Sequence, residues 1–194
     1  SYSDAVIDRV KARKDKAQVQ SWFMDLNLVL DYWGETARTY HHTAPINSLF
    51  ALHESLVMLQ EEGLEQAWSR HRLHHEAFKA GIEAMGLEFL VNPANRLPQM
   101  NAVKVPASFA PGVEAQLRKR LLADYSMEIG AGLGPLAGKI WRFGLMGQSC
   151  SRANVMSCLG ALTCELPEFG VQVKMGDAEQ AALDVYNRAA HQHA

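Results

Sequence analysis

The sequence has no excess of charge of one sign. Its 194 residues include 19 lysines and arginines against 21 aspartates and glutamates, which gives a formal net charge of -2. Nucleic-acid binding draws on a positive field that offsets the charge of the phosphate backbone. We therefore expect no nucleic-acid partner.

The sequence also lacks a long uninterrupted apolar run. The most apolar stretch, residues 46–59, contains Asn47, Ser48, His53 and Glu54, whereas a membrane-spanning helix needs about 20 apolar residues. No basic segment followed by an apolar one opens the sequence, as it would in a signal peptide. We expect no membrane span.

Cysteine is scarce. Cys150, Cys158 and Cys164 are an odd number crowded into one short stretch, and their spacing is not that of a zinc site. This pattern favours reduced thiols over a disulfide framework. It predicts a cytoplasmic protein.

Apolar residues are abundant, at 48% of the sequence, which is enough for a sizeable core. Two clear helical patterns, at residues 45–61 and 64–85, have apolar side chains at three- and four-residue steps. Pro45 suits the start of the first helix, and Gly63 and Gly86 suit the ends. Within the first helix, His53 falls on the apolar side and is predicted to be a hydrogen-bonded core histidine.

The spacing of apolar residues shifts towards two after Gly86, which predicts short strands separated by turns and by further helices. The strands are expected at residues 87–91, 101–105, 127–130 and 140–145. The helices are expected at residues 113–125 and 151–165, with a peripheral one at 177–190. This order predicts an α+β fold, a small sheet with helices on one face. Before residue 45 the pattern is weaker, with a helix at 4–16 and a β-prone patch at 19–23.

A glycine-rich loop, residues 130–139, precedes the last predicted strand. It is not a Walker loop, because three residues rather than four separate Gly134 from Gly138, and Ile140 rather than serine or threonine follows Lys139. It is not a dinucleotide fingerprint either, because a strand and not a helix follows it. We predict a tightly turned or mobile loop.

An arginine interrupts the apolar strand that follows. Arg142 shares a face with Ile140 and Gly144 by the two-residue period, and Gly144 leaves room beside it. The guanidinium is a planar fork that suits a carboxylate. An anionic ligand and an internal salt bridge both remain open at this point.

Histidines cluster on the second helix, where His71, His74 and His75 share a face. No carboxylate or cysteine joins them at metal-site spacing, so we predict a solvated surface and no metal.

Polar side chains also gather where the first clear helix begins. Tyr40, His41, His42 and Thr43 precede Pro45, and the exposed N–H groups of a helix start, together with hydroxyls, can hold a phosphate. Thr43 could equally act only as the N-cap. Both interpretations remain open.

Taken together, residues 40–71, 96–106 and 128–155 resemble the alanine/serine–glyoxylate aminotransferases, the class V, fold-type I group of pyridoxal-phosphate enzymes. The similarity runs from about Ser3 to Leu162. It implies that residues 1–62 are the end of a large α/β cofactor domain with a long connecting helix. Residues 63–194 would be the small C-terminal domain with its antiparallel sheet.

The resemblance also implies roles for three residues in a homodimer. Tyr40 and Thr43 of the YHHT motif would hold the phosphate of the neighbouring subunit's pyridoxal 5'-phosphate. Arg142 would bind the α-carboxylate of a small amino acid or 2-oxo acid. The expected activity moves an amino group from alanine or serine to glyoxylate or a similar acid.

The family's Schiff-base lysine, its aspartate for the pyridine nitrogen and its stacking aromatic match no position here. Lys11, Lys14 and Lys16 correspond to no Schiff-base position, and pyridoxal-phosphate chemistry requires that lysine. We therefore expect this chain alone to be inactive. It would be a truncation, a proteolytic fragment or one half of a split enzyme with a separate N-terminal chain. The alternative is a non-catalytic dimerisation or binding domain of the same fold.

Overall fold

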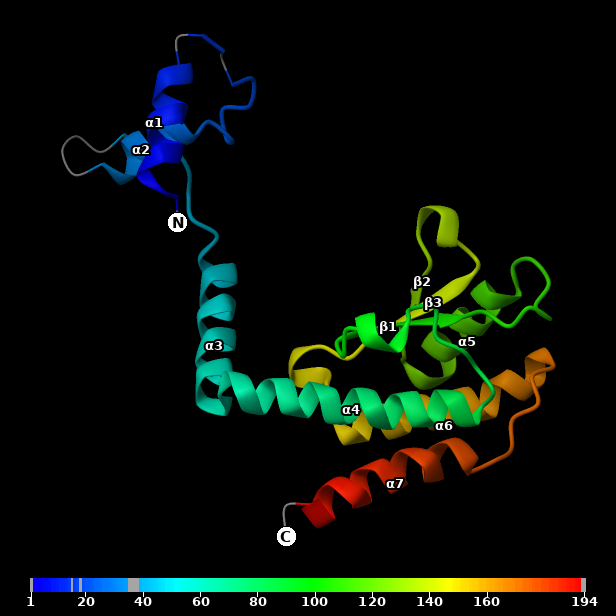
Figure 1. The fold of residues 1–194 in the computed structure, drawn as a ribbon. Helices are drawn as coiled ribbons and strands as arrows, with labels where there is room; N and C mark the ends of the chain where they lie inside the picture. Colours follow the sequence, from blue (N-terminus) through cyan, green and yellow to red (C-terminus); the bar gives the residue numbers. More distant parts are fainter. Residues whose placement is uncertain (1, 15, 18, 35–38, 193–194) are drawn as a thin grey trace. The chain divides into compact units, whose positions relative to one another are not determined.

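The computed structural model describes residues 2–14, 16–17, 19–34 and 39–192. The chain divides into two compact units, Ser1–Val57 and Met58–Ala194. The division falls inside one helix, close to the domain boundary predicted between residues 62 and 63. That boundary stays a prediction for the complete protein. Figure 1 shows the elements of each unit.

The first unit is helical in its described part. It holds α1 (Asp4–Arg13), α2 (Leu26–Trp33) and the start of α3 (Ile46–Glu62), with no strand in the described residues. The side chain of Asp25 caps α2 by accepting from the backbone N–H of Asn27. The β-prone patch predicted at residues 19–23 is wrong, because these residues form bends and turns.

The second unit contains the remaining helices and all described strands. Its helices are α4 (Leu64–Ala84), α5 (Val113–Tyr125), α6 (Arg152–Glu165) and α7 (Asp177–Gln192). Its strands are β1 (Met100–Lys104), β2 (Gly130–Ala131) and β3 (Ile140–Gly144). Ser151 caps α6 by accepting from the backbone N–H of Asn154, as its position in the sequence suggests.

The three strands form an antiparallel sheet in the order β1-β3-β2, so β3 lies in the centre. The two-residue period puts Val103, Trp141 and Phe143 on one face, and these side chains are buried. Helices cover that face: Phe78 of α4 packs its ring against Phe143 at 5.1 Å between centroids. The predicted small sheet with helices on one face is confirmed.

Helices α4, α6 and α7 pack side by side beneath the sheet (Figure 1). The prediction of a peripheral helix near the carboxyl end is wrong. Ala178 and Ala182 of α7 are fully buried, and Tyr186 is nearly so. These alanines allow α7 to approach its neighbouring helices closely, because an alanine side chain adds little bulk between two helix axes.

The strand predicted at residues 87–91 is replaced by a single bridge between Phe89 and Val103. The backbone N–H of Leu90 still donates to Ala102, so this segment follows β1 without forming a regular strand. Residues 127–130 likewise give only the two-residue β2.

Two predictions about histidines are wrong. His71, His74 and His75 are buried rather than solvated, at 8%, 8% and 5% exposure. His53 is exposed rather than in a core, because α3 buries none of its residues in this chain.

Among the residues that the structure describes, no helix has the length and apolar content to cross a bilayer.

Candidate functional site

Arg142 lies in the central strand on the face opposite the helices. Its neighbours Trp141 and Phe143 point into the core and anchor β3, whereas Arg142 itself is half-buried. A strand fixed on one side by two aromatic rings holds its other side chains at defined positions. The fold therefore presents Arg142 from a rigid element.

The guanidinium of Arg142 has one protein partner in the described residues. Its Nε donates to the backbone carbonyl of Ala131 in β2 at 2.7 Å. No described carboxylate forms an ion pair with it, so the internal salt bridge left open by the sequence is not found there. The two terminal nitrogens keep donors available for an anion.

The glycine-rich loop closes beside this strand. The backbone N–H of Gly132 donates to Ile140, and a side chain at Gly132 would collide with the backbone of Leu136. The loop is thus a tight turn between β2 and β3 that requires glycine at this position. Leu133 is left 68% exposed at its outer edge.

A second arginine holds the turn that follows β3. Arg70 of α4 donates from Nη1 to the carbonyls of Gly147 and Cys150, and from Nη2 to Glu62 at 2.8 Å. Glu62 raises the pKa of Arg70, and Arg70 in turn lowers the pKa of Glu62 through their hydrogen bond. Sequence reasoning assigned no role to Arg70, because the two carbonyls that it holds, those of Gly147 and Cys150, are 77 and 80 residues away along the chain.

The three buried histidines of α4 each reach a different element. His71 accepts at Nε2 from the N–H of Gly147, and His74 bonds the Tyr186 hydroxyl at 2.9 Å. His75 donates from Nδ1 to Asn101 at 2.7 Å. Burial lowers the pKa of His74 and of His75. These side chains are satisfied core groups that join α4 to the turn after β3, to α7 and to β1.

Tyr40 and Thr43 meet in the first unit, just before α3. Their hydroxyls lie 2.6 Å apart and are exposed. Thr43 has no other described partner, so it does not cap α3 in the described residues. The N–H of Ile46 bonds the carbonyl of Ala44 and that of Leu49 bonds Pro45. Two exposed hydroxyls beside the start of a helix provide donors that suit a phosphate.

The intervening histidines hold this segment in place. His41 is 3% exposed, stacks on Trp22 with ring centroids 4.1 Å apart, and bonds the carbonyl of Trp22 through Nε2. Because Nε2 must donate to a carbonyl, its Nδ1 accepts from His42 Nδ1 at 2.7 Å. The sequence placed His41 in this group of polar residues, but its aromatic support from Trp22 was missed.

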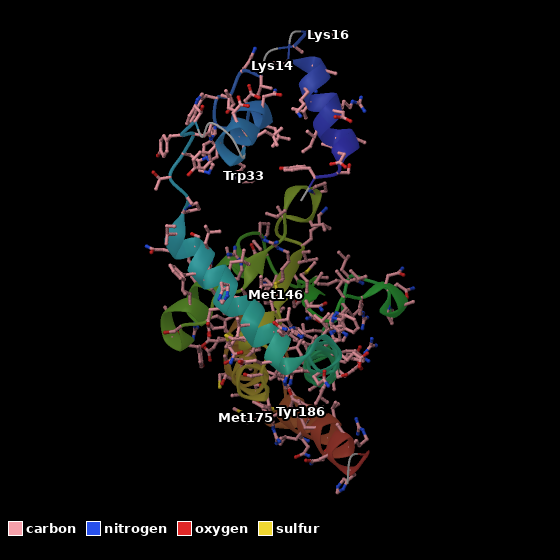
Figure 2. All side chains as sticks on the ribbon, turned by 90° about the vertical axis from the view of Figure 1, so that its left-hand side faces the viewer. Lys14, Lys16, Trp33, Met146, Met175 and Tyr186 are labelled. Carbon is pink, nitrogen blue, oxygen red and sulfur yellow. The ribbon has the colours of Figure 1, made fainter. Side chains whose placement is uncertain are left out.

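The three lysines of the first unit lie in or just after α1. Lys11 is in that helix, and Lys14 and Lys16 are exposed near its end (Figure 2). None of the three has a described contact with Tyr40 or Thr43. Each site residue is placed within its own unit, Tyr40 and Thr43 in the first and Arg142 in the second.

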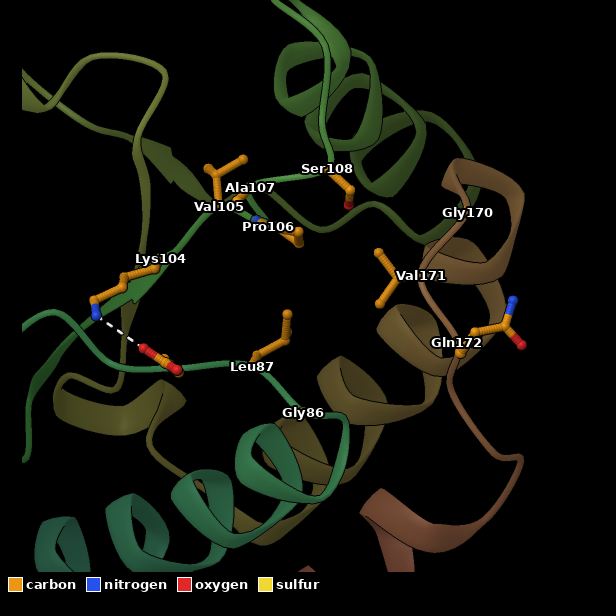
Figure 3. Close-up of a pocket in the computed structure, with 11 residues that line it drawn as sticks. Gly86, Leu87, Lys104, Val105, Pro106, Ala107, Ser108, Gly170, Val171 and Gln172 are labelled. Atoms are coloured by element: carbon orange, nitrogen blue, oxygen red, sulfur yellow. Dashed lines mark hydrogen bonds and ion pairs between the residues drawn. The ribbon is translucent and has the colours of Figure 1, made fainter.

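The second unit also has a cavity of about 440 Å³, lined by the segments 86–88, 104–108 and 170–172 (Figure 3). Leu87, Val105 and Val171 give it an apolar lining. The ion pair between Lys104 and Glu88, 2.8 Å long, closes one rim. Because both charges at the rim are paired, the cavity offers no free charged group.

The cysteines and histidines form no metal site in the part of the chain that the structure describes, where no three metal-binding side chains converge. Cys150, Cys158 and Cys164 are free thiols. Burial raises the pKa of Cys158 to about 12, which keeps that thiol protonated and unreactive.

Comparison with known proteins identifies several relatives, although no protein-family model matches the chain. The (S)-ureidoglycine–glyoxylate transaminase of Bacillus subtilis is 38% identical over 211 residues, covering 100% of this chain and 50% of that protein. The alanine–glyoxylate aminotransferase of Oryctolagus cuniculus is 39% identical over 158 residues, covering 80% of this chain and 39% of that protein.

Solved structures show the same similarity in three dimensions. The ureidoglycine–glyoxylate aminotransferase of Bacillus subtilis superimposes with a TM-score of 0.86 at 40% identity, over 96% of this chain and 47% of that one. The pyridoxamine–pyruvate aminotransferase of Mesorhizobium loti gives 0.77 at 26% identity, over 94% and 46%. The chain spans about half the length, or less, of the relatives it matches.

Proposed function

We propose, from the premise that this chain is a homologue of part of the glyoxylate aminotransferases, that it supplies the substrate-carboxylate contact and a cofactor-phosphate contact of such an enzyme. The complete enzyme would move an amino group from a small amino acid to glyoxylate or a similar small 2-oxo acid. The observation that carries the proposal is the half-buried guanidinium of Arg142, on the sheet face opposite the helices, without a carboxylate partner in the described residues.

Arg142 would bind the carboxylate that the amino donor and the oxo acceptor share. A guanidinium and a carboxylate form two parallel charge-assisted hydrogen bonds, which fix the orientation of the substrate as well as its position. Because both half-reactions use acids of the same type, one arginine serves both. This explains why a charged side chain is kept in a strand whose neighbours are aromatic.

Tyr40 and Thr43 would hold the phosphate of pyridoxal 5'-phosphate. Their paired, exposed hydroxyls and the adjacent start of α3 fit a phosphate, since a dianion accepts several hydrogen bonds and favours a helix N-terminus. When bound, the cofactor supplies the electron sink for transamination. The residues of this chain would position the cofactor's phosphate and the substrate's carboxylate. The Schiff-base lysine would be supplied from outside this sequence.

The complete enzyme would be a homodimer. The apolar side chains of α3 support this part of the proposal: Leu49, Phe50 and Leu52 are 48%, 71% and 55% exposed, and the helix buries none of its residues. Exposed apolar surface of this extent is typical of an interface.

The complete enzyme would be cytoplasmic. The free thiols of this chain suit the reducing environment of that compartment.

The amino donor would be alanine or serine. Ureidoglycine is a second candidate, because the Bacillus subtilis relative named for it matches the whole of this chain. The acceptor is common to both possibilities, since the names of both relatives include glyoxylate.

The test is to replace Arg142→Ala in the complete aminotransferase. Loss of two charge-assisted hydrogen bonds should lower kcat/KM for donor and acceptor by about a hundredfold or more. Arg188→Ala is the matched control, because Arg188 is an exposed arginine of α7. Unchanged kinetics in Arg142→Ala would overturn the carboxylate role.

This chain expressed alone should not transaminate alanine and glyoxylate. Turnover by the isolated chain would contradict the proposal that the catalytic lysine lies elsewhere.

A further inference from the structure

We propose that the two-residue strand β2 positions the carboxylate anchor: Gly130 leaves the space in which the Arg142 guanidinium lies, and the carbonyl of Ala131 fixes its direction. This inference rests on the carboxylate role of Arg142 proposed above. It adds Gly130 as a positioning residue for binding a small 2-amino or 2-oxo acid.

The sheet register brings β2 directly beside Arg142. Gly130 is the antiparallel partner of Arg142, and Ala131 is the partner of Trp141. Side chains of paired residues project from the same face of a sheet. The position of Gly130 is therefore the one from which a side chain would meet the arginine.

The space above Gly130 is filled by the arginine itself. A Cβ added at Gly130 would lie 3.3 Å from three atoms of Arg142, namely Cβ, Nε and Nη2. At this distance Arg142 must shift by a few tenths of an ångström to make room, and the Cβ of Arg142 cannot shift unless the strand shifts with it. The missing side chain at residue 130 thus determines where the guanidinium can lie.

The carbonyl of Ala131 determines how the guanidinium is turned. It accepts from Nε at 2.7 Å, so the Nε edge of the fork is occupied by the protein. A carboxylate can approach a guanidinium through Nε and one terminal nitrogen, or through the two terminal nitrogens. With Nε occupied, only the second approach remains, which directs the carboxylate end-on to Arg142.

The consequence is a specific kinetic signature. A shift of the guanidinium weakens the contact to the carboxylate, and this group is common to the amino donor and the oxo acceptor. A side chain at residue 130 should therefore raise KM for both substrates by a similar factor and leave kcat nearly unchanged. A general folding defect would instead lower kcat and thermal stability.

The experiment compares Gly130→Ala and Gly130→Val in the complete aminotransferase with Gly160→Ala. The control adds the same methyl group in α6, where its only close neighbour is Glu179 Oε1 at 3.6 Å. We expect Gly130→Ala to raise both KM values about three- to tenfold, Gly130→Val to raise them further, and Gly160→Ala to leave them unchanged. Thermal unfolding of each variant is measured in parallel.

A binding measurement without turnover complements the kinetics. The ¹⁵Nε resonance of Arg142 reports its bond to Ala131 and is followed while glyoxylate is added to the holoenzyme in the absence of an amino donor. In the parent enzyme the Nε–H signal should persist while glyoxylate binds, because the carboxylate uses the terminal nitrogens. In Gly130→Val the signal should move before glyoxylate is added, and the affinity for glyoxylate should fall.

The outcomes separate this inference from the proposed function. If Arg142→Ala raises both KM values but neither Gly130 variant does, the positioning role is wrong and the carboxylate role stands. If Arg142→Ala has no effect, both are wrong. If the Gly130 variants lose kcat and thermal stability with unequal KM changes, Gly130 is structural only, and the inference is overturned.

Discussion

The two units of this chain differ in how much of their apolar surface they bury. The second unit encloses a continuous core, in which Phe78, Trp141 and Leu162 are fully or almost fully shielded from water. In the described part of the first unit, only Asn27 and His41 are buried, whereas Trp22, Phe23 and Trp33 are 56% to 62% exposed. Burial of apolar area is the main driving force of folding. The second unit thus has its own source of stability, whereas the described part of the first unit leaves most of its apolar side chains uncovered.

This difference matches the roles proposed for the two units. Arg142 is held by a strand that the core anchors on one face, through its chain neighbours Trp141 and Phe143. Tyr40 and Thr43 flank a small aromatic cluster in which His41 stacks on Trp22, and the ring of Tyr40 contacts that of Tyr32. We expect the carboxylate contact to be preformed and the phosphate contact to depend on the rest of the enzyme.

The largest expected effect comes from truncating matched leucines in the two regions. Leu162→Ala in α6 removes a fully buried side chain and should lower the free energy of unfolding by about 2–5 kcal/mol. Leu52→Ala in α3 removes a side chain that is 55% exposed, and should change it by less than about 0.5 kcal/mol. Urea unfolding of this chain, followed by circular dichroism, measures both. Similar losses in the two variants would show that the first region has a core after all.

A smaller effect is expected where three helices meet at Gly81 of α4. A methyl group there would collide with Leu159 of α6 and come within 3.1 Å of the carbonyl oxygen of Ala178 in α7. Because Leu159 is itself fully buried, it has little room to move away. Gly81→Ala should lower the free energy of unfolding by about 1–3 kcal/mol. A Gly81→Ala variant as stable as the parent in thermal unfolding would mean that the helices can separate freely.

The smallest effect is a pH dependence that two buried histidines of the second unit contribute. Burial lowers the pKa of His74, as do the charges of Arg70 and His71. Burial also lowers the pKa of His75; there Asn101 and Glu76 oppose the shift, and Lys79 and Arg96 add to it. The unfolded chain therefore binds more protons than the folded one between the lowered pKa and about 6.5. The contribution of these two histidines to stability is fully present above about pH 6.5 and decreases as the pH falls through this window.

His75→Gln tests that dependence, because glutamine can still donate to Asn101 but does not titrate. The slope of unfolding free energy against pH should become shallower in this variant. His53→Gln, at an exposed position of α3, is the matched control in the other region. A slope that His75→Gln leaves unaltered would contradict a contribution from this buried histidine.

The sequence predicted the individual helices better than their packing. Residues 45–61 and 64–85 were correctly assigned as helices, because a three- and four-residue apolar period needs no tertiary information. The segment at residues 87–91 was wrongly assigned as a strand. Whether it forms a regular strand depends on how far it pairs with β1, and it makes a single bridge there. His71, His74 and His75 were wrongly placed in solvent, since their partners lie on other elements.

The proposed site residues divide in the same way. The sequence by itself singled out Arg142, Tyr40 and Thr43, because an arginine in an apolar strand and hydroxyls before a helix are local features. The tertiary structure alone decided that Arg142 pairs with the carbonyl of Ala131 and lies over Gly130. The reason is physical: a periodic pattern determines which face of an element is apolar, but long-range pairing determines which groups meet across that face.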